Sequence, residues 1–273
     1  MLFRGKILRN KFMGIKDYYI LDGALSYEVD GEHTDMELTM AEMEILRSHL
    51  STVRNSVHLC CGAGRHVSAF GGMNVYSVGM DISPYLIAQG QKNIIKKKLA
   101  DYAYMILGEA TETPFSLHSI DCVTLLGNSI SLFSNEKSVE LLKEIKRILR
   151  SNGIFILDIP HPSYAASNLV KNYEISRSIK TNTLGKVSWT WSRKMDSCKK
   201  ILTSQERISY IDEKGCQKVK NLLFKFCLYD PLEICSMASN VGLELIKQIE
   251  FNDISGCYLG MLKKRIFFIL KAV

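Results

Sequence analysis

The stretch Val57-His-Leu-Cys-Cys-Gly-Ala-Gly-Arg-His66 decides the fold of this chain. Its first residues predict a short apolar strand, and Gly62 and Gly64 follow at once. Glycines at a strand-to-helix turn let backbone N–H groups approach a ligand, and the N-terminus of the next helix favours a negative group. A tight turn with a purely structural role has the same pattern. The stretch therefore indicates a ligand-binding turn only if motifs elsewhere in the chain agree with it.

Apolar strands alternate with helices after this point. The predicted strands span residues 57–60, 75–80, 104–107, 120–126, 154–159, 243–251 and 266–271, and the predicted helices begin at Ser83-Pro84 and span 139–149, closed by Asn152-Gly153, and 231–240. Such alternation predicts a parallel sheet that helices cover on both faces. The last two strands, which follow each other directly, predict an antiparallel hairpin at its end.

The chain divides into three predicted parts. Residues 1–50 predict a helical arm or lid, in which Thr39 and Glu42 are spaced as a capping box. Residues 51–160 and 229–273 predict the α/β domain. Residues 161–228 predict an antiparallel β insertion, with β segments over 186–195, 199–211 and 217–228 that are rich in aromatic and β-branched residues. This insertion is expected to cap a pocket or to form the contact of a homodimer.

Composition narrows the classes of protein. The 273 residues carry a formal charge of +7, but the basic residues are spread thinly, and the densest cluster, Lys92 to Lys98, is typical of the solvated face of one helix. A nucleic-acid partner is therefore not favoured. Eight cysteines without a Cys-x-x-Cys pair predict neither a disulfide framework nor a metal site. The absence of a long apolar run or a secretory h-region predicts a cytoplasmic protein without membrane contact.

Polar residues follow the later strands of the predicted sheet. Asp81 ends the second strand, where a carboxylate can accept hydrogen bonds from both hydroxyls of a ribose; capping of the next helix is the alternative role. Glu109 and Ala110 follow the third strand, and Gly127-Asn128 follow the fourth. Ligands of open α/β sheets bind at these carboxyl ends.

In this order the segments resemble the motifs of class I S-adenosylmethionine-dependent methyltransferases. The resembling stretches are Cys61-Gly-Ala-Gly-Arg-His, Val78-Gly-Met-Asp-Ile-Ser-Pro, Gly108-Glu-Ala-Thr-Glu-Thr-Pro-Phe, Ile120-Asp-Cys-Val-Thr-Leu-Leu-Gly-Asn-Ser and Leu149-Arg-Ser-Asn-Gly-Ile-Phe-Ile-Leu-Asp. The resemblance implies a Rossmann-like, seven-stranded, mostly parallel sheet with S-adenosyl-L-methionine as the cofactor.

The resemblance also implies a role for each matching position. The methionine end of the cofactor would lie against Cys60, Gly62, Gly64 and Arg65, the ribose against Asp81, the adenine against Ile82, Glu109 and Ala110, and the methionine or the acceptor against Leu126 and Asn128. Two positions depart from the family. His58 stands where an acidic residue is usual, and Cys60 where a glycine is usual. Each departure predicts a shifted cofactor, weaker binding, or an altered or lost activity.

The acceptor is expected to be a small molecule, methylated on nitrogen or oxygen. The fourth motif lacks the Asn-Pro-Pro-Tyr or Asp-Pro-Pro-Tyr sequence of many nucleic-acid and protein methylases. Candidate catalytic residues are His161, Asn128 and Tyr27; a loop histidine fixed between two prolines and a turn asparagine are the alternative roles of the first two. Trp189, Trp191 and Phe226 either line an acceptor pocket or pack the core of the insertion.

Three other functions remain open for this fold. The chain could use S-adenosylmethionine for a reaction other than methyl transfer, such as intramolecular alkylation. It could be a binding protein that has lost catalysis, which the residues at positions 58 and 60 suggest. It could also methylate RNA, which the net charge suggests and which would require strong, salt-dependent RNA affinity.

Overall fold

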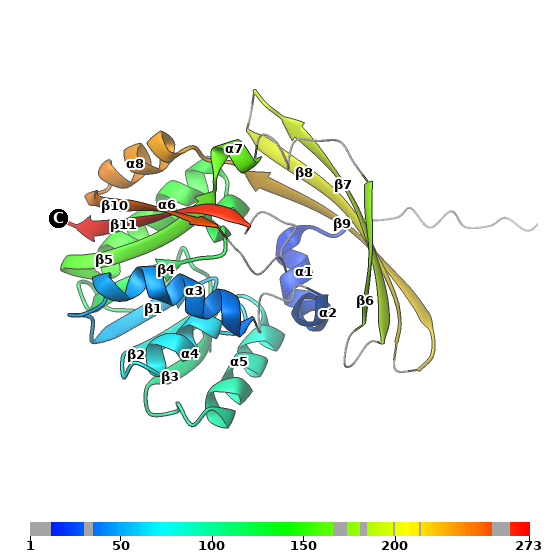
Figure 1. The fold of residues 1–273 in the computed structure, drawn as a ribbon, viewed down its shortest axis with the longest axis horizontal. Helices are drawn as coiled ribbons and strands as arrows, with labels where there is room; N and C mark the ends of the chain where they lie inside the picture. The colour runs from blue at the N-terminus through cyan, green and yellow to red at the C-terminus, as the bar shows by residue number, and fades with distance from the viewer. Residues whose placement is uncertain are drawn as a thin grey trace, which may run out of the picture.

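The computed structural model describes residues 12–29, 35–165, 174–180, 185–198, 200–212, 214–252 and 263–273. Two β-sheets form the frame of the molecule, with a helical arm between them (Figure 1). The larger sheet carries helices on both faces and lies opposite the smaller sheet across the arm.

The larger sheet has seven strands, as the sequence predicts. They are β1 (Asn55–Leu59), β2 (Tyr76–Asp81), β3 (Ala103–Leu107), β4 (Ile120–Leu125), β5 (Leu149–Pro160), β10 (Leu243–Asn252) and β11 (Lys264–Ala272). Their order is β10-β11-β5-β4-β1-β2-β3. The strands from β5 to β3 run parallel, and β11 is antiparallel to both β5 and β10. The carboxyl ends of β1, β2, β3 and β4 therefore meet at one edge.

Helices cover both faces because the strands are apolar on both sides. On one face α6 (Asn135–Ile148) and α8 (Pro231–Ser239) pack on buried residues of β1, β4, β5 and β11. On the other face α3 (Met36–Leu46) and α4 (Arg65–Gly71) pack on β4, β5, β10 and β11. A further helix, α5 (Pro84–Lys96), packs on β3, and burial of Ile94 among its exposed lysines accounts for the Lys92 to Lys98 cluster.

Side-chain caps set the beginnings of several helices. Ser83 caps α5, with Pro84 in the first turn, as the sequence predicts. The predicted capping box at Thr39 is wrong, because α3 begins at Met36 and Asp35 accepts the Leu38 N–H at 2.8 Å.

Two other predicted boundaries differ from the structure. The helix predicted over 139–149 begins at Asn135, because Ser134 accepts the backbone N–H of Lys137. The chain then passes directly from Ile148 into β5, so Asn152-Gly153 lies within the β5 range instead of closing the helix.

The smaller sheet is the predicted antiparallel insertion. It contains β6 (Glu174–Lys180), β7 (Lys186–Asp196), β8 (Ile201–Ile211) and β9 (Gln217–Cys227), in that order. The sequence predicts the last three strands and does not predict β6. Lys200, at the start of β8, donates to Asp230 and Glu233 at the N-terminus of α8, at 2.7 Å each, which ties the insertion to the α/β domain.

The arm consists of α1 (Ile15–Leu21) and α2 (Gly23–Val29), which lie between the two sheets (Figure 1). Tyr18 and Leu25 are buried in one cluster with Leu222 and Phe224 of the insertion. Met13 exchanges backbone hydrogen bonds with residues 221 and 223 of β9, at 3.0 Å each. The arm is thus part of the core of the insertion.

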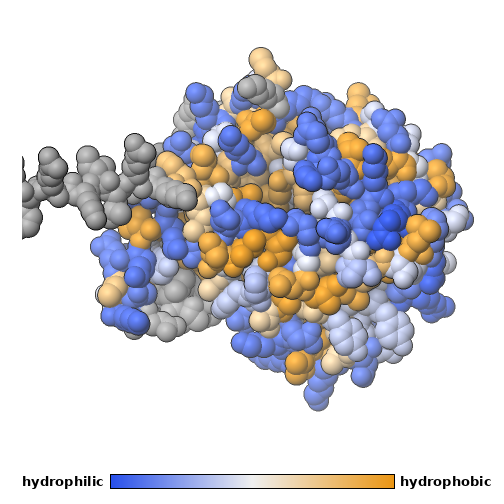
Figure 2. Space-filling view, turned by 180° about the vertical axis from the view of Figure 1, so that it is seen from behind, coloured by the Kyte–Doolittle hydropathy of each residue, from blue (hydrophilic) through white to orange (hydrophobic). Residues whose placement is uncertain are grey.

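Hydrophilic and hydrophobic side chains alternate over the face of the molecule that Figure 2 shows. Among the helices that the structure describes, none has the length and apolar character needed to cross a membrane.

Candidate cofactor and acceptor site

The loop between β1 and α4 has an unusual backbone. Cys60, Gly62 and Gly64 all have positive φ, at 50°, 55° and 74°. At Gly64 a Cβ would come 2.7 Å from the sulfur of Met105, so this position also needs glycine for space. Cys60 adopts a conformation that costs a side-chain-bearing residue of order 1 kcal/mol. The loop therefore has a left-handed backbone at Cys60, the position where the resemblance leads one to expect a glycine.

Asp81 connects this loop to the end of β2. Its Oδ2 accepts the Gly62 N–H at 2.9 Å and its Oδ1 accepts the Ser83 N–H at 2.9 Å. The carboxylate is buried, and this burial raises the pKa of Asp81 against the opposing effect of those N–H donors. Each oxygen has acceptor capacity left over. The side-chain cap of α5 is Ser83, so the alternative role of Asp81 as the cap of that helix is wrong.

The residues that the resemblance assigns to the adenine follow β2 and β3 in the chain. Gly108 N donates to the carbonyl of Asp81 at 3.0 Å, which holds the two strand ends together. Glu109 is partly exposed and forms a 2.6 Å ion pair with Lys16 of α1. Ala110 is buried in the core, and Ile82 is half-buried beside Asp81. The arm therefore reaches the side chain that the resemblance assigns to the adenine.

The turn after β4 is also held by side chains. Asn128 has a φ of 59°, and its amide nitrogen Nδ2 donates to Ser131 Oγ at 2.9 Å. Its backbone N–H donates to Asp158 Oδ1 at 3.2 Å. Leu126 is buried in the same cluster as residues of α3. The side chain of Asn128 thus forms the turn, and its backbone faces the carboxyl edge of the sheet.

Arg65 is the first residue of α4, and its side chain turns away from the loop. Its guanidinium donates to both carboxylate oxygens of Glu42 and, at 3.1 Å, to Thr39 Oγ1. His66 Nε2 lies 2.7 Å from Glu42 Oε2. Burial of His66 and the charge of Arg65 lower the pKa of this imidazole.

Sequence reasoning missed three buried charged residues beside the site: Glu42, Asp158 and Arg265. Arg265 donates to Glu42 Oε1 and, at 2.8 Å, to Asp158 Oδ2, and it is fully buried. Burial raises the pKa of Glu42, but Arg265, His66 and Arg65 outweigh it and hold that pKa well below its usual range. A charged residue inside an apolar strand, as at positions 158 and 265, is the signal that could have revealed this cluster.

His58 is buried and neutral. Its ring nitrogens lie 2.8 Å from Thr124 Oγ1 and 3.0 Å from Ser56 Oγ, and burial lowers its pKa to about 3. Both imidazole nitrogens therefore have hydroxyl partners, one on β1 itself and one on the neighbouring β4. His58 fastens β1 to β4 and does not reach the glycine loop as the family's carboxylate does.

The other two predicted catalytic residues, His161 and Tyr27, have partners outside the loop. His161 Nδ1 is 2.8 Å from Ser163 Oγ, and its Nε2 is 3.5 Å from Glu250 of β10. Because β10 is on the opposite side of β5 from β4 and β1, the imidazole points away from the cofactor loop. Tyr27 of α2 packs edge-on against Tyr85 of α5, with ring centroids 6.3 Å apart.

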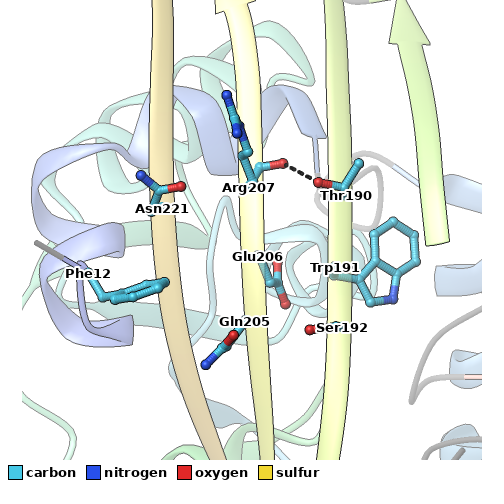
Figure 3. A pocket seen from close by; sticks show the side chains of 8 residues that line it. All are labelled: Phe12, Thr190, Trp191, Ser192, Gln205, Glu206, Arg207 and Asn221. Atoms are coloured by element: carbon cyan, nitrogen blue, oxygen red, sulfur yellow. Dashed lines mark hydrogen bonds between the residues drawn. The ribbon is translucent and has the colours of Figure 1, made fainter. Parts of the chain in front are cut away.

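A pocket of about 300 Å³ lies on the insertion (Figure 3). Its lining residues are Phe12, Thr190, Trp191, Ser192, Gln205, Glu206, Arg207 and Asn221. Alternation along the strands places most of these side chains on the face turned away from the arm. None of the predicted cofactor residues lines this pocket.

Comparison with known proteins bears on this site. Residues 57–153 match the family model described as a methyltransferase domain. No curated protein sequence matches the chain significantly. Among solved structures, a S-adenosylmethionine-dependent methyltransferase from Clostridium acetobutylicum is 13% identical with a TM-score of 0.70, and the match covers 92% of this chain and 97% of that one.

Two other similar structures have more specific descriptions. The CcbJ methyltransferase from Streptomyces caelestis is 14% identical with a TM-score of 0.68, covering 95% and 96% of the two chains. The sugar N-methyltransferase KedS8 from Streptoalloteichus sp is 13% identical with a TM-score of 0.65, covering 89% and 90%.

Residues 57–153 thus match a methyltransferase domain, and the chain has the fold of the S-adenosylmethionine-dependent methyltransferase structures to which it is similar, as its motifs predict. The cofactor of this class is S-adenosyl-L-methionine, and the residues present fit it. The glycine loop has positive φ at residues 60, 62 and 64, and Asp81 is a buried carboxylate with acceptor capacity at the strand end.

Proposed function

We propose that this chain transfers the methyl group of S-adenosylmethionine to a nitrogen of a small molecule, with oxygen as the less favoured acceptor atom. The observation that carries the proposal is the contact between Asp81 and the Gly62 N–H at the carboxyl edge of the sheet. It brings a buried carboxylate and a glycine loop together at the place where ligands of open α/β sheets bind. The similarity to a sugar N-methyltransferase supports the choice of nitrogen.

The cofactor supplies an electrophilic methyl group on a sulfonium. The residues of the chain would bind and orient it: the backbone of Gly62 and Gly64 at the methionine end, Asp81 at the ribose, and Ile82 and Glu109 at the adenine. The 2.6 Å pair between Lys16 and Glu109 would close the arm over the adenine edge. Transfer to a neutral amine requires in-line placement and no general base on the protein.

We place the acceptor between the arm and the inner face of the insertion. Leu132, in the short helix η3 (Ser129–Leu132) that follows Asn128, packs in the same cluster as Leu202 and Phe224 of the insertion. This face therefore borders the turn after β4. The carboxylate of Glu206 is buried there and accepts from Trp189 Nε1 at 2.9 Å, and a carboxylate can also accept a hydrogen bond from the N–H of a neutral amine.

Calorimetry with S-adenosylmethionine and S-adenosylhomocysteine tests the cofactor site. Asp81→Asn keeps the size of the side chain but removes a charged acceptor, so it should weaken binding at least tenfold. The exposed Asp101, changed to Asn, is the matched control and should leave affinity within about twofold. Absence of heat from the native chain with either ligand would refute the proposal.

Methylation assays on paired acceptors test the acceptor class. An amino sugar and the corresponding hydroxy sugar differ only in the nucleophilic atom. We expect mass spectrometry to find the methylated product of the amine only, and Glu206→Gln to reduce that product. Methylation of the hydroxy sugar alone would contradict the choice of nitrogen. A homodimer through the insertion stays a prediction, which sedimentation of the native chain would test.

A further inference from the structure

Glu42 is a buried carboxylate that lies outside the motifs assigned to the cofactor by resemblance. Its side chain on α3 is completely excluded from solvent. It contacts three cationic or potentially cationic groups: Arg65, His66 and Arg265. Two of these are the first residues of α4, immediately after Gly64. A carboxylate from a distant helix thus holds the end of the glycine loop, where the family's own carboxylate is replaced by His58.

The same cluster also contacts the turn after β4, on the other side of the proposed cofactor site. Arg265 donates to Asp158 Oδ2 at 2.8 Å, and Asp158 Oδ1 accepts the backbone N–H of Asn128 at 3.2 Å. An unbroken series of hydrogen bonds therefore runs from Arg65, through Glu42 and Arg265, to the turn after β4. The glycine loop and this turn are the two segments that would hold the methionine end of the cofactor.

The charges of the cluster balance. Two carboxylates, Glu42 and Asp158, face two guanidinium groups, Arg65 and Arg265. Buried charge pairs of this kind add little net stability but make any loss of one partner costly, because the other charge is left unpaired. Such networks also fix geometry, since each group has few alternative partners at low dielectric.

We infer that Glu42 is a positioning residue for cofactor binding: through Arg65 it fixes the glycine loop, and through Arg265 and Asp158 it fixes the turn at Asn128. This inference rests on the proposed cofactor site and names the residue that compensates for His58. Glu42 itself does not touch the cofactor, because its oxygens are already occupied by the cluster.

Conservative variants test the inference while most of the charged groups of the cluster stay in place. Glu42→Asp keeps the carboxylate but shortens its reach, and Arg65→Gln leaves Glu42 paired with Arg265. Glu44→Asp, on the exposed face of α3, is the matched control. In calorimetry with S-adenosylhomocysteine we expect both cluster variants to bind at least tenfold more weakly than the native chain, and the control to bind within twofold.

Hydrogen exchange of the ligand-free proteins separates positioning from general loss of stability. In both cluster variants we expect faster exchange in peptides that cover residues 60–66 and 126–131, with the insertion strands β7 and β8 unchanged. Affinity within twofold of native overturns the inference, and so does weaker binding with unchanged exchange in the two loops. If the native chain binds no S-adenosylhomocysteine, the proposed function fails, and the exchange result alone decides whether Glu42 positions the loops.

Discussion

His58 and Cys60 show how single residues adapt a glycine motif. His58 packs edge-on against Phe70, with ring centroids 4.6 Å apart, and joins two strands through hydroxyl partners. Cys60 keeps a left-handed backbone that glycine would adopt without cost. Neither residue removes the loop from its place. Glu42 of α3 contacts Arg65 and His66 at the end of the loop, so a carboxylate from another element lies beside it.

The buried His58 predicts a loss of stability in acid. Burial lowers its pKa to about 3, whereas an unfolded histidine titrates near about 6.5. The unfolded chain therefore binds a proton that the folded chain does not, and the free energy of unfolding decreases as pH falls from about 6.5 toward 3, by up to about 1.4 kcal/mol per pH unit.

Urea unfolding at about pH 7, 6 and 5 measures this slope. His58→Asn removes the titrating group and should make the decrease between pH 6 and 5 shallower, even though the variant starts less stable. The exposed His118, changed to Asn, is the control. Parallel slopes in the His58 variant and the native chain would show that His58 is not responsible.

The cysteines predict an order of alkylation. Burial raises the pKa of the Cys60, Cys61 and Cys122 thiols, so these groups stay protonated. Cys198 and Cys216 are exposed. Among these five we expect iodoacetamide at mildly alkaline pH to label the exposed pair first, as peptide mass spectrometry would show. Early labelling of Cys60 would mean that the loop opens readily.

At the scale of elements, α2 depends on close packing at its first residue. A Cβ on Gly23 would overlap Ser83 Oγ and lie 3.0 Å from Tyr85 Cβ, at the start of α5. Ser83 is also the residue whose N–H donates to Asp81. Ser83 therefore contacts both the start of α2 and the residue that is proposed to bind the ribose.

Gly23→Ala should displace α2 and disturb the contacts of Ser83 with α2 and with Asp81. We expect weaker S-adenosylhomocysteine binding and faster proteolysis of the arm, since the neighbouring backbone of α5 cannot yield without moving Asp81. Gly14→Ala is the control, because a Cβ there meets nothing within 4 Å. Equal affinity and equal protease resistance in the two variants would separate the arm from the cofactor site.

At the scale of the whole molecule, the arm and the insertion form one core. Phe224 is buried and stacks against Tyr18 of α1, with ring centroids 5.4 Å apart. Phe224→Ala should lower the free energy of unfolding by about 3 kcal/mol or more, because it leaves a cavity between the two parts. Val219→Ala, at an exposed position of the same strand, should change it by less than about 0.5 kcal/mol.

Denaturant unfolding followed by tryptophan fluorescence checks this prediction, since both tryptophans lie on β7. Similar midpoints for the two variants would mean that the contact between the arm and the insertion contributes little to stability. A large loss for Phe224→Ala alone would show that the insertion and the arm share one core.

The sequence alone determined the strands of the larger sheet, their alternation with helices, and the glycine loop with Asp81 at its edge. These features depend on local patterns: apolar runs, turn residues and caps. The β6 strand was not predicted, and the first turn of α3 was placed too late.

Only the tertiary structure decided what holds the loop. Glu42 and Arg265 are 223 residues apart in the chain, and Arg265 and Asp158 are 107 apart. No periodicity or spacing connects such residues, because their meeting depends on β11 lying beside β5 and on α3 covering that face. The same holds for Lys16 and Glu109, which meet only because the arm folds back onto the end of β3. Local patterns place the groups that would touch a cofactor, whereas long-range packing selects the charges that fix them in place.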